Sequence, residues 1–285
     1  MVAPALPLER GNRFVFEFGA ISFEVDPTIG GRVTSLRFDG TELLTGPDLE
    51  PVNFGSTFWP SPQSVWFWPP PPEWDSAPYA VAIQGASLVL SGAPNQALGL
   101  SAKKTFTAEP ERDAMIVEYA IENHGSAEAR VAAWEITRVF PRGVSFYPAA
   151  SAPYPNIDLA LPVTTTTDGV TFLEYDPAKV TGHEKLLADG AEGWLAHATD
   201  GVLLLKTFDD IPRDQAAPGE GEIEIYLDGQ KRYLEVEQQG AYTTLAPGQS
   251  LIWTVRWHLR QIPETVTVAA GSAALVALAR ATAAR

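Results

Sequence analysis

Alternating apolar and polar residues run through most of the chain and predict short β-strands. Residues 13–27, RFVFEFGAISFEVDP, alternate on both sides of Gly19-Ala20 and predict an antiparallel hairpin. In residues 31–44, Asp39-Gly40 separates two further runs, which is a strong signal for a hairpin turn. Similar runs follow at 80–92, 98–110, 114–125, 129–141, 169–175, 193–208 and 221–262. Many short strands with Gly, Asp and Pro turns predict an all-β sandwich or barrel.

Three stretches depart from this pattern. The tail, residues 271–285, predicts a short helix, and residues 151–169 form an irregular region that includes four consecutive threonines. No alternation of strands with helices, linker-like change of composition or clean internal repeat is present. We therefore expect one domain over residues 1–285, since large all-β domains reach this length.

The third stretch, residues 55–79, holds four of the eight tryptophans and a run of four prolines. This proline content predicts an extended loop rather than a central strand or a helix. The loop either shields the end of the sandwich or presents its indole rings to a ligand, and loops on a rigid β-scaffold commonly carry binding residues. We favour the ligand-facing interpretation, with the following candidates for its lining: Trp59, Gln63, Trp66, Trp68, Trp74 and Asp75.

Composition narrows the classes of function. The net charge of −15, with no basic cluster to reverse it locally, argues against binding to nucleic acid or to anionic membranes. The chain has no cysteine, which excludes disulfides, thiolate catalysis and cysteine-ligated metals. No apolar run is long enough for a bilayer, and the N-terminus lacks the features of a secretory signal. We expect a cytoplasmic monomer or homodimer, or a periplasmic protein if a leader has been removed.

Familiar catalytic motifs are missing. The sequence contains no glycine-rich phosphate loop, no histidine pair with metal-ligand spacing and no serine-nucleophile elbow. The histidines are scattered at His124, His183, His197 and His258. We therefore expect neither a metal nor an organic cofactor, and carboxylates, a few cations and tryptophans remain as candidate chemistry.

Two strands place such residues on a common face. Tyr233, Glu235, Glu237 and Gln239 alternate along one strand, so they line either a solvated surface or a polar pocket wall. We favour a pocket wall, because Tyr and Gln satisfy buried polar neighbours.

Residues 129–141 form the second such strand. Trp134 and Arg138 share one face, and Glu135 lies on the other. Arg138 is either a clamp for a sugar or a carboxylate, or a packing partner of Trp134. Lys206 ends an apolar strand and either reaches the sheet edge or points into a cavity.

Carbohydrates are the ligand class that best fits this combination. The C–H faces of sugars pack on indole rings, and their hydroxyls need both donors and acceptors. We therefore expect a sugar or a sugar derivative as the partner molecule.

Both ends of the chain resemble one family. Residues 23–44, FEVDPTIGGRVTSLRFDGTELL, are similar to the opening hairpins of aldose 1-epimerases and their galactose mutarotase-like relatives. Residues 233–259, with a "LxPG" turn at Leu245–Gly248, are similar to their closing strands, and residues 123–140 resemble their central unit. The resemblance implies a β-supersandwich of large antiparallel sheets that binds a hexose or hexose derivative in a concave face, without a cofactor.

The resemblance also implies roles for individual residues. Glu235 takes the position of the catalytic base. The family's central histidine, the general acid, is missing, so the candidates for its role are His183, His197 or a cation such as Arg138 or Lys206 acting electrostatically. The remaining candidates for substrate binding are Arg32, Trp134, Glu135, Arg138, Lys206 and Glu237.

Three functions stay open from the sequence. The first is an isomerase of the aldose 1-epimerase type. The second is a non-catalytic sugar-binding protein or sensor on the same fold, which the missing histidine favours. The third is a lyase or hydrolase acting on an acidic sugar, because a fold alone does not determine chemistry.

Overall fold

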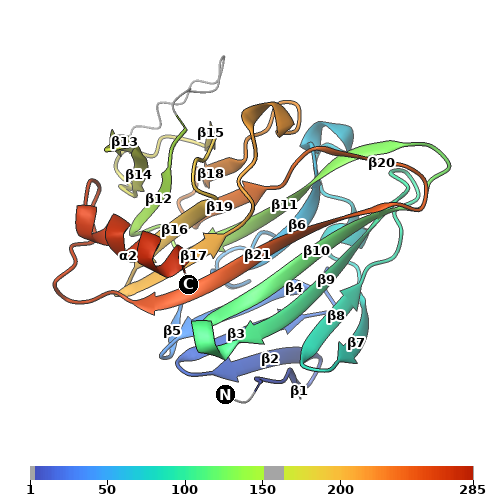
Figure 1. The fold of residues 1–285 in the computed structure, drawn as a ribbon, viewed down its shortest axis with the longest axis horizontal. Coiled ribbons are helices and arrows are strands. Elements are labelled where there is room, and N and C mark those ends of the chain that lie inside the picture. The colour runs from blue at the N-terminus through green and yellow to red at the C-terminus, as the bar shows by residue number, and fades with distance from the viewer. Residues whose placement is uncertain (1–3, 151–163, 285) are drawn as a thin grey trace.

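The computed structural model describes residues 4–150 and 164–284, and their arrangement is shown in Figure 1. Two large antiparallel sheets pack face to face. Most of the irregular region expected at 151–169 lies outside the described residues, and its four threonines form a strand at the end of one sheet. The predicted all-β class with two large antiparallel sheets is therefore confirmed.

The first sheet contains eleven strands in the described part of the chain. Its main path runs β1-β2-β3-β4-β6-β11-β19-β18-β15, with β5 paired to β4 and β20 paired to β11. The strands are β1 (Leu8–Arg10), β2 (Arg13–Phe18), β3 (Ile21–Asp26), β4 (Arg32–Phe38), β5 (Thr41–Glu42), β6 (Ser56–Ser61), β11 (Ala129–Val139), β15 (Glu184–Ala188), β18 (Ile223–Leu227), β19 (Leu234–Gln239) and β20 (Thr243–Leu245).

The second sheet contains ten strands within the same described ranges. Its order is β13-β14-β12-β16-β17-β21-β10-β9-β8-β7. The strands are β7 (Ala80–Gln84), β8 (Ser87–Ser91), β9 (Leu100–Glu109), β10 (Ala114–Asn123), β12 (Val144–Pro148), β13 (Thr164–Thr167), β14 (Val170–Glu174), β16 (Trp194–Thr199), β17 (Val202–Thr207) and β21 (Ser250–Gln261).

Both predicted hairpins are confirmed. Strands β2 and β3 pair on either side of Gly19-Ala20, and β4 pairs with β5 across Asp39-Gly40. Asp39 and Gly40 both have positive φ (47° and 81°), which explains the need for Asp-Gly in this turn. The alternation along β3 buries Phe23 against Trp257 of the other sheet, with ring centroids 5.5 Å apart. Contacts of this kind between the inner faces form the main core.

The predicted C-terminal helix is confirmed as α2 (Ala273–Ala283). Ser272 is its N-cap, because its hydroxyl accepts a hydrogen bond from the Leu275 N–H at 3.3 Å. Leu275, Val276 and Ala279 pack against apolar residues of the second sheet and build a second apolar cluster. The helix therefore covers part of the second sheet and does not cover the outer face of the first sheet (Figure 1).

The prediction that residues 55–79 contain no central strand or helix is wrong at two places. Residues 56–61 form β6, between β4 and β11, and α1 (Pro72–Asp75) is a short helix that begins with proline. Strand β6 tolerates Pro60 because β4 pairs with β6 only through Val33 and Ser56, so that side of Pro60 has no strand partner. The Pro60 carbonyl instead accepts the Trp66 indole N–H at 2.7 Å. Proline at the first helical position is favourable, because no N–H is needed there.

Candidate functional site

The outer face of the first sheet carries a cavity. Cross-strand pairing places Arg138 of β11 opposite Glu235 of β19, which lies opposite Tyr226 of β18 and then Lys185 of β15. Ile136, which precedes Arg138 by two residues on β11, lies opposite Glu237 of β19. Residues directly opposite one another share a face of the sheet, so the register assembles these polar side chains.

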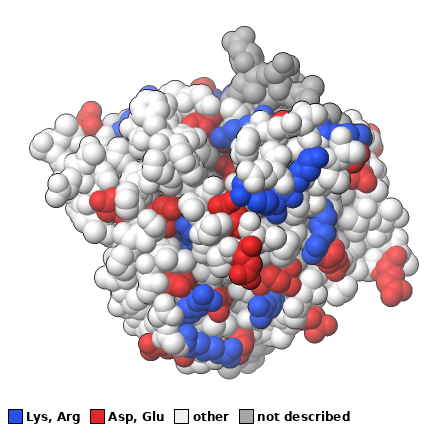
Figure 2. Space-filling view, turned by 180° about the vertical axis from the view of Figure 1, so that it is seen from behind, with Lys and Arg blue, Asp and Glu red and all other residues white. Residues whose placement is uncertain are grey.

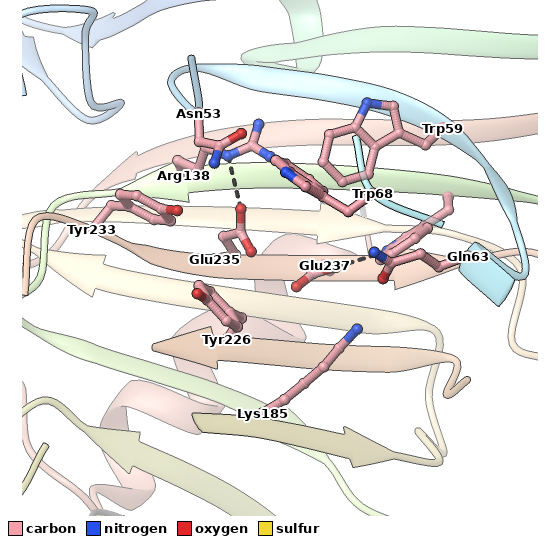
Figure 3. A pocket seen from close by; sticks show the side chains of 11 residues that line it. Asn53, Trp59, Gln63, Trp68, Arg138, Lys185, Tyr226, Tyr233, Glu235 and Glu237 are labelled. Carbon is pink, nitrogen blue, oxygen red and sulfur yellow. Dashed lines mark hydrogen bonds and ion pairs between the residues drawn. The ribbon is translucent and has the colours of Figure 1, made fainter. Parts of the chain in front are cut away.

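The cavity has a volume of about 290 Å³, at the low end of the range for small-molecule sites. Figure 3 shows the carboxylates of Glu235 and Glu237 between Arg138 above and Lys185 below. The complete lining is Asn53, Trp59, Gln63, Trp68, Trp134, Arg138, Lys185, Tyr226, Tyr233, Glu235 and Glu237.

Arg138 is fully buried and holds one of the two carboxylates. Its Nε donates to Glu235 Oε1 at 2.8 Å, and its Nη1 donates to Thr57 Oγ1 at 2.9 Å. Its Nη2 is buried and has no hydrogen-bond partner among the residues that the structure describes. A buried guanidinium nitrogen without an acceptor is costly, so this N–H is available to an oxygen atom of a ligand in the cavity.

The two carboxylates have different partners. Burial raises the pKa of Glu235 above its ordinary value, and the Arg138 cation opposes that rise. Glu237 accepts a hydrogen bond from the Trp134 indole at 2.8 Å, and burial raises its pKa well above the usual range. A guanidinium favours the ionised form of Glu235, whereas an indole N–H brings no charge to Glu237. The two carboxyl groups therefore differ in their direct partners, and the Lys185 ammonium opposes the rise in the pKa of both.

Lys185 belongs to a second charged network. It forms an ion pair with Glu224, and its ammonium lies 5.0 Å from the centre of the Trp134 ring. Burial opposes ionisation of Lys185, but Glu224 and Glu237 raise its pKa above the ordinary value. Glu224 also accepts a hydrogen bond from Gln239 Nε2 at 2.6 Å, so Lys185 is held in one position as a cation.

Tryptophan rings form one wall of the cavity. Trp59 meets the rings of Trp134 and Trp68 edge-on, at centroid distances of 5.6 Å and 6.0 Å. The Arg138 guanidinium lies 5.3 Å from the centre of the Trp59 ring. Apolar ring faces and charged groups thus line the same small volume, which suits a ligand that has both C–H and hydroxyl surfaces.

The structure brings seven of the residues proposed from the sequence to this cavity. An eighth candidate, Trp66, lies behind the lining, where its ring packs on Trp59 and Trp134. The seven lining residues are Trp59, Gln63, Trp68, Trp134, Arg138, Glu235 and Glu237.

Arg32, Trp74 and Asp75 were proposed to bind substrate, but they are buried outside the cavity. Arg32 pairs with Asp75 at 3.1 Å and donates to the Val52 carbonyl at 2.7 Å. Asp75 also accepts the Trp59 indole N–H at 2.9 Å. Trp74 is fully buried, with its ring 5.7 Å from that of Phe58. These residues hold α1 and the loop before β6 in place.

Glu135 and Lys206 were also proposed for the site, but they lie between the two sheets. Glu135 is fully buried and accepts hydrogen bonds from Tyr119 and Trp257 of the second sheet. Lys206 forms an ion pair with it. Because side chains alternate along a strand, the face of β11 that carries Glu135 is opposite to the face that carries Arg138. Glu135 and Lys206 therefore form a charged pair within the core.

Neither candidate histidine lines the cavity. His197 is buried in β16 of the second sheet and forms a hydrogen bond with Ser145 at 2.9 Å, and burial lowers its pKa to about 4. The side chain of His183 is 59% exposed and forms a hydrogen bond with the hydroxyl of Tyr226, which lines the cavity. The structure therefore does not bring either histidine, proposed as the general acid, into the cavity lining.

Four residues of the lining were not among the candidates for catalysis or substrate binding: Asn53, Lys185, Tyr226 and Tyr233. Tyr233 was expected on the same pocket wall as Glu235 and Glu237, without a role in binding or catalysis, and it lies in the lining. Tyr226 comes from residues 221–262, where alternation predicted strands, whereas β15, which carries Lys185, lies outside the predicted runs. Tyr226 lies beside Glu235 because β18 and β19 are consecutive paired strands, whereas the position of Lys185 depends on the long-range pairing of β15 with β18, which no local pattern reveals.

Charges of both signs meet on this side of the molecule. Figure 2 shows acidic and basic atoms next to one another near the middle of the face. Within residues 4–150 and 164–284, no group of three or more His, Asp or Glu side chains is arranged to hold a metal ion. In the same ranges, no helix combines the length and the apolar character needed to cross a bilayer.

Comparison with known proteins supports the fold. Residues 52–260 match the family described as Domain of unknown function (DUF4380). No curated protein matches the sequence.

Solved structures share the architecture. A galactose mutarotase-like protein from Lactobacillus casei has a TM-score of 0.62 and 12% identity, over 87% of this chain and 100% of that one. A galactose mutarotase related enzyme from Lactobacillus acidophilus also has a TM-score of 0.62, with 9% identity over 90% and 99% of the two chains. A galactose mutarotase-like protein from Clostridium acetobutylicum has a TM-score of 0.55 and 11% identity, over 88% and 95%. The resemblance inferred from the sequence is confirmed at the level of the fold.

Proposed function

The chain belongs to the DUF4380 family, and we propose that it binds a pyranose sugar in this cavity and interconverts its two anomers. The observation that carries the proposal is the pair Glu235 and Glu237, which lie on one face of β19 with different hydrogen-bond partners. The mutarotase-like neighbours share only the fold, but they make a sugar the first ligand to test.

Anomer exchange needs one base and one acid near the same carbon atom. The base removes the proton of the anomeric hydroxyl, and the acid protonates the ring oxygen, so the ring opens to an aldehyde. Rotation about the adjacent C–C bond exposes the other face of the carbonyl, and the reverse proton transfers close the ring. The sugar and the enzyme end with the same protons they had at the start, and each well-placed group contributes roughly 10²–10⁴-fold.

The different environments of the two carboxyls assign these roles. Arg138 stabilises the ionised form of Glu235, which suits the base. Glu237 accepts a hydrogen bond from the neutral Trp134 indole, and burial raises its pKa well above the usual range although the Lys185 ammonium opposes that rise, which suits the acid. Pairs of carboxyls with such divided environments are a common solution for acid and base chemistry near neutral pH. Glu237 therefore replaces the histidine that the resemblance implies and that this chain lacks.

The geometry is compatible with a single sugar ring. Residues two apart on a strand are separated by roughly 7 Å along it. The anomeric hydroxyl and the ring oxygen are bonded to the same carbon, so a ring above β19 can offer one oxygen to each carboxyl. The free Nη2 of Arg138 is available to a third sugar oxygen, and the Trp59 and Trp134 rings provide apolar surface.

The test is anomeric exchange measured by proton NMR on neutral hexoses, hexose phosphates and uronic acids. We expect acceleration by the wild type and a loss of roughly 100-fold or more in Glu235→Gln and in Glu237→Gln. The matched control is Glu264→Gln, which alters an exposed carboxylate in the turn after β21 and should leave the exchange unchanged. The pH profile of the exchange rate separates the two roles. E235Q should remove the dependence of the rate on an ionised base, and E237Q should remove its dependence on a protonated acid.

Binding without exchange would support the second function considered from the sequence, a non-catalytic sugar-binding protein. That result would remove the catalytic assignment and keep the ligand class. Failure of every sugar to bind would refute the proposal as a whole.

A further inference from the structure

Two consecutive aromatic residues, Phe67 and Trp68, are exposed, and the second of them lines the cavity. Phe67 is 72% exposed and Trp68 is 55% exposed. Every other Phe and Trp among residues 4–150 and 164–284 is buried or half-buried. Figure 3 shows the ring of Trp68 in the cavity lining, between the side chains of Arg138 and Trp59. Exposed aromatic surface that borders a polar site indicates a binding surface.

The segment that carries this pair is held firmly. The N–H groups of Trp66 and Phe67 both donate to the Gln63 carbonyl, at 3.1 Å and 2.8 Å. The Gln63 N–H donates to Glu220 Oε1 at 2.9 Å, and the Trp66 ring packs on Trp59. The two exposed rings are therefore presented by an anchored backbone, which lowers the entropy that a ligand must overcome on binding.

Phe67 also has an unusual backbone conformation. Its φ is +56°, in the left-handed region that bulky side chains seldom adopt. Strain of this kind persists at positions where the surrounding structure and the function require it. The Phe67 ring is exposed, so packing in the core does not explain why an aromatic residue occupies this position.

We propose that Phe67 and Trp68 bind a second sugar ring, so that the substrate is a reducing oligosaccharide whose terminal ring occupies the cavity. This inference rests on the proposed function. The cavity of about 290 Å³ holds one ring, and further rings must lie outside it. Exchange of anomers needs a free anomeric hydroxyl in the cavity, so the second ring is attached through another hydroxyl of the first. Its C–H face then stacks on the exposed aromatic rings.

The test compares sugars that share a reducing end. Glucose is measured against maltose, cellobiose, laminaribiose and gentiobiose, galactose against β-1,4-galactobiose, and mannose against β-1,4-mannobiose. Calorimetry gives the Kd for each, and NMR gives the anomeric exchange. We expect at least one disaccharide to bind about tenfold more tightly than its monosaccharide, equivalent to about 1.4 kcal/mol.

Two variants locate the effect. Phe67→Asn keeps a residue that tolerates the left-handed conformation but lacks the ring, and Trp68→Leu removes the indole. Phe67→Asn alone should reduce the disaccharide advantage and leave the monosaccharide Kd within about twofold, because Phe67 is not part of the cavity lining. Combining the two changes should abolish the disaccharide advantage. Ile83→Asn is the matched control, because Ile83 is 54% exposed on β7 of the other sheet. Thermal unfolding of each variant checks that the fold is retained.

The outcomes separate this inference from the proposed function. Equal affinity for monosaccharides and disaccharides would overturn the second subsite and leave the cavity assignment intact. Binding of no sugar at all would overturn both. A change of oligomeric state in the double variant, with sugar affinities unchanged, would show that the aromatic pair is a self-association surface and would also overturn the inference.

Discussion

Arg138 and Glu235 lie directly opposite each other on β11 and β19, and their side chains form an ion pair on the cavity face of the first sheet. Arg138 is fully buried, and Glu235 is 9% exposed. A charged pair in such a position contributes little when intact, but removal of one partner leaves the other charge without compensation. The pair therefore orients Glu235 and makes each residue strongly dependent on the other.

Replacement of Arg138 by Met should destabilise the fold by about 3–5 kcal/mol at pH 8. The loss should be smaller at pH 5, because Glu235 can then take up a proton. Urea unfolding at both pH values measures this effect. The double variant Arg138→Met with Glu235→Gln should recover much of the lost stability, and additive losses from the two changes would contradict the coupling.

The two neighbouring tryptophans Trp68 and Trp74 should respond very differently to replacement by alanine. Trp74 is fully buried against Phe58, so Trp74→Ala should cost about 3–5 kcal/mol of unfolding free energy. Trp68 is more than half exposed, so Trp68→Ala should cost less than about 1 kcal/mol while it weakens disaccharide binding. Denaturant unfolding of both variants is the measurement, and similar losses would mean that Trp68 is part of the core.

Strand periodicity was sufficient to predict much of the fold. Alternation across Gly19-Ala20 and Asp39-Gly40 located two hairpins, and the alternation of residues 233–239 placed Glu235 and Glu237 on one face. It did not show which face of a strand points outward. Glu135 and Arg138 were for that reason both assigned to the site, although only Arg138 faces the cavity. That distinction depends on how the two sheets pack.

Proline content misled the prediction for residues 55–79. The rule that excludes proline from central strands assumes a strand partner on both sides. Strand β6 lacks one beside Pro60, and the Trp66 indole satisfies the Pro60 carbonyl instead. The role of Asp75 was equally hidden, because its contact with Arg32 joins residues 43 positions apart.

His197 should control stability at acid pH and should not affect anomeric exchange. Burial lowers its pKa to about 4, so the folded protein binds this proton less readily than the unfolded chain. The stability that it contributes is present above about pH 6.5 and is lost as the pH falls toward 4. His197→Gln should reduce the loss of stability between about pH 6.5 and pH 4. The part of the loss that is due to His258, whose pKa is also lowered to about 4, should remain in this variant. An exchange rate that fell with His197→Gln would contradict its position away from the cavity.

Glu220 should make stability depend on pH in the opposite sense. Its carboxylate accepts the Gln63 N–H and lies 4.0 Å from the Lys185 ammonium. Burial and the nearby Glu224 raise its pKa to about 8. A raised pKa means that the folded state binds the proton more tightly, so the stabilising contribution is complete below about pH 4.5 and is lost as the pH rises toward 8.

Glu220→Gln tests this pH dependence without removing the acceptor for Gln63. Its amide oxygen can replace the carboxylate oxygen, so the segment that carries Trp68 should stay in place. We expect the variant to lose less stability than the wild type between pH 5 and pH 8, measured by urea unfolding at intervals across that range. Glu264→Gln, at an exposed turn, should follow the wild-type curve. If Glu220→Gln also follows that curve, Glu220 does not change its proton affinity on folding and its burial does not determine its charge.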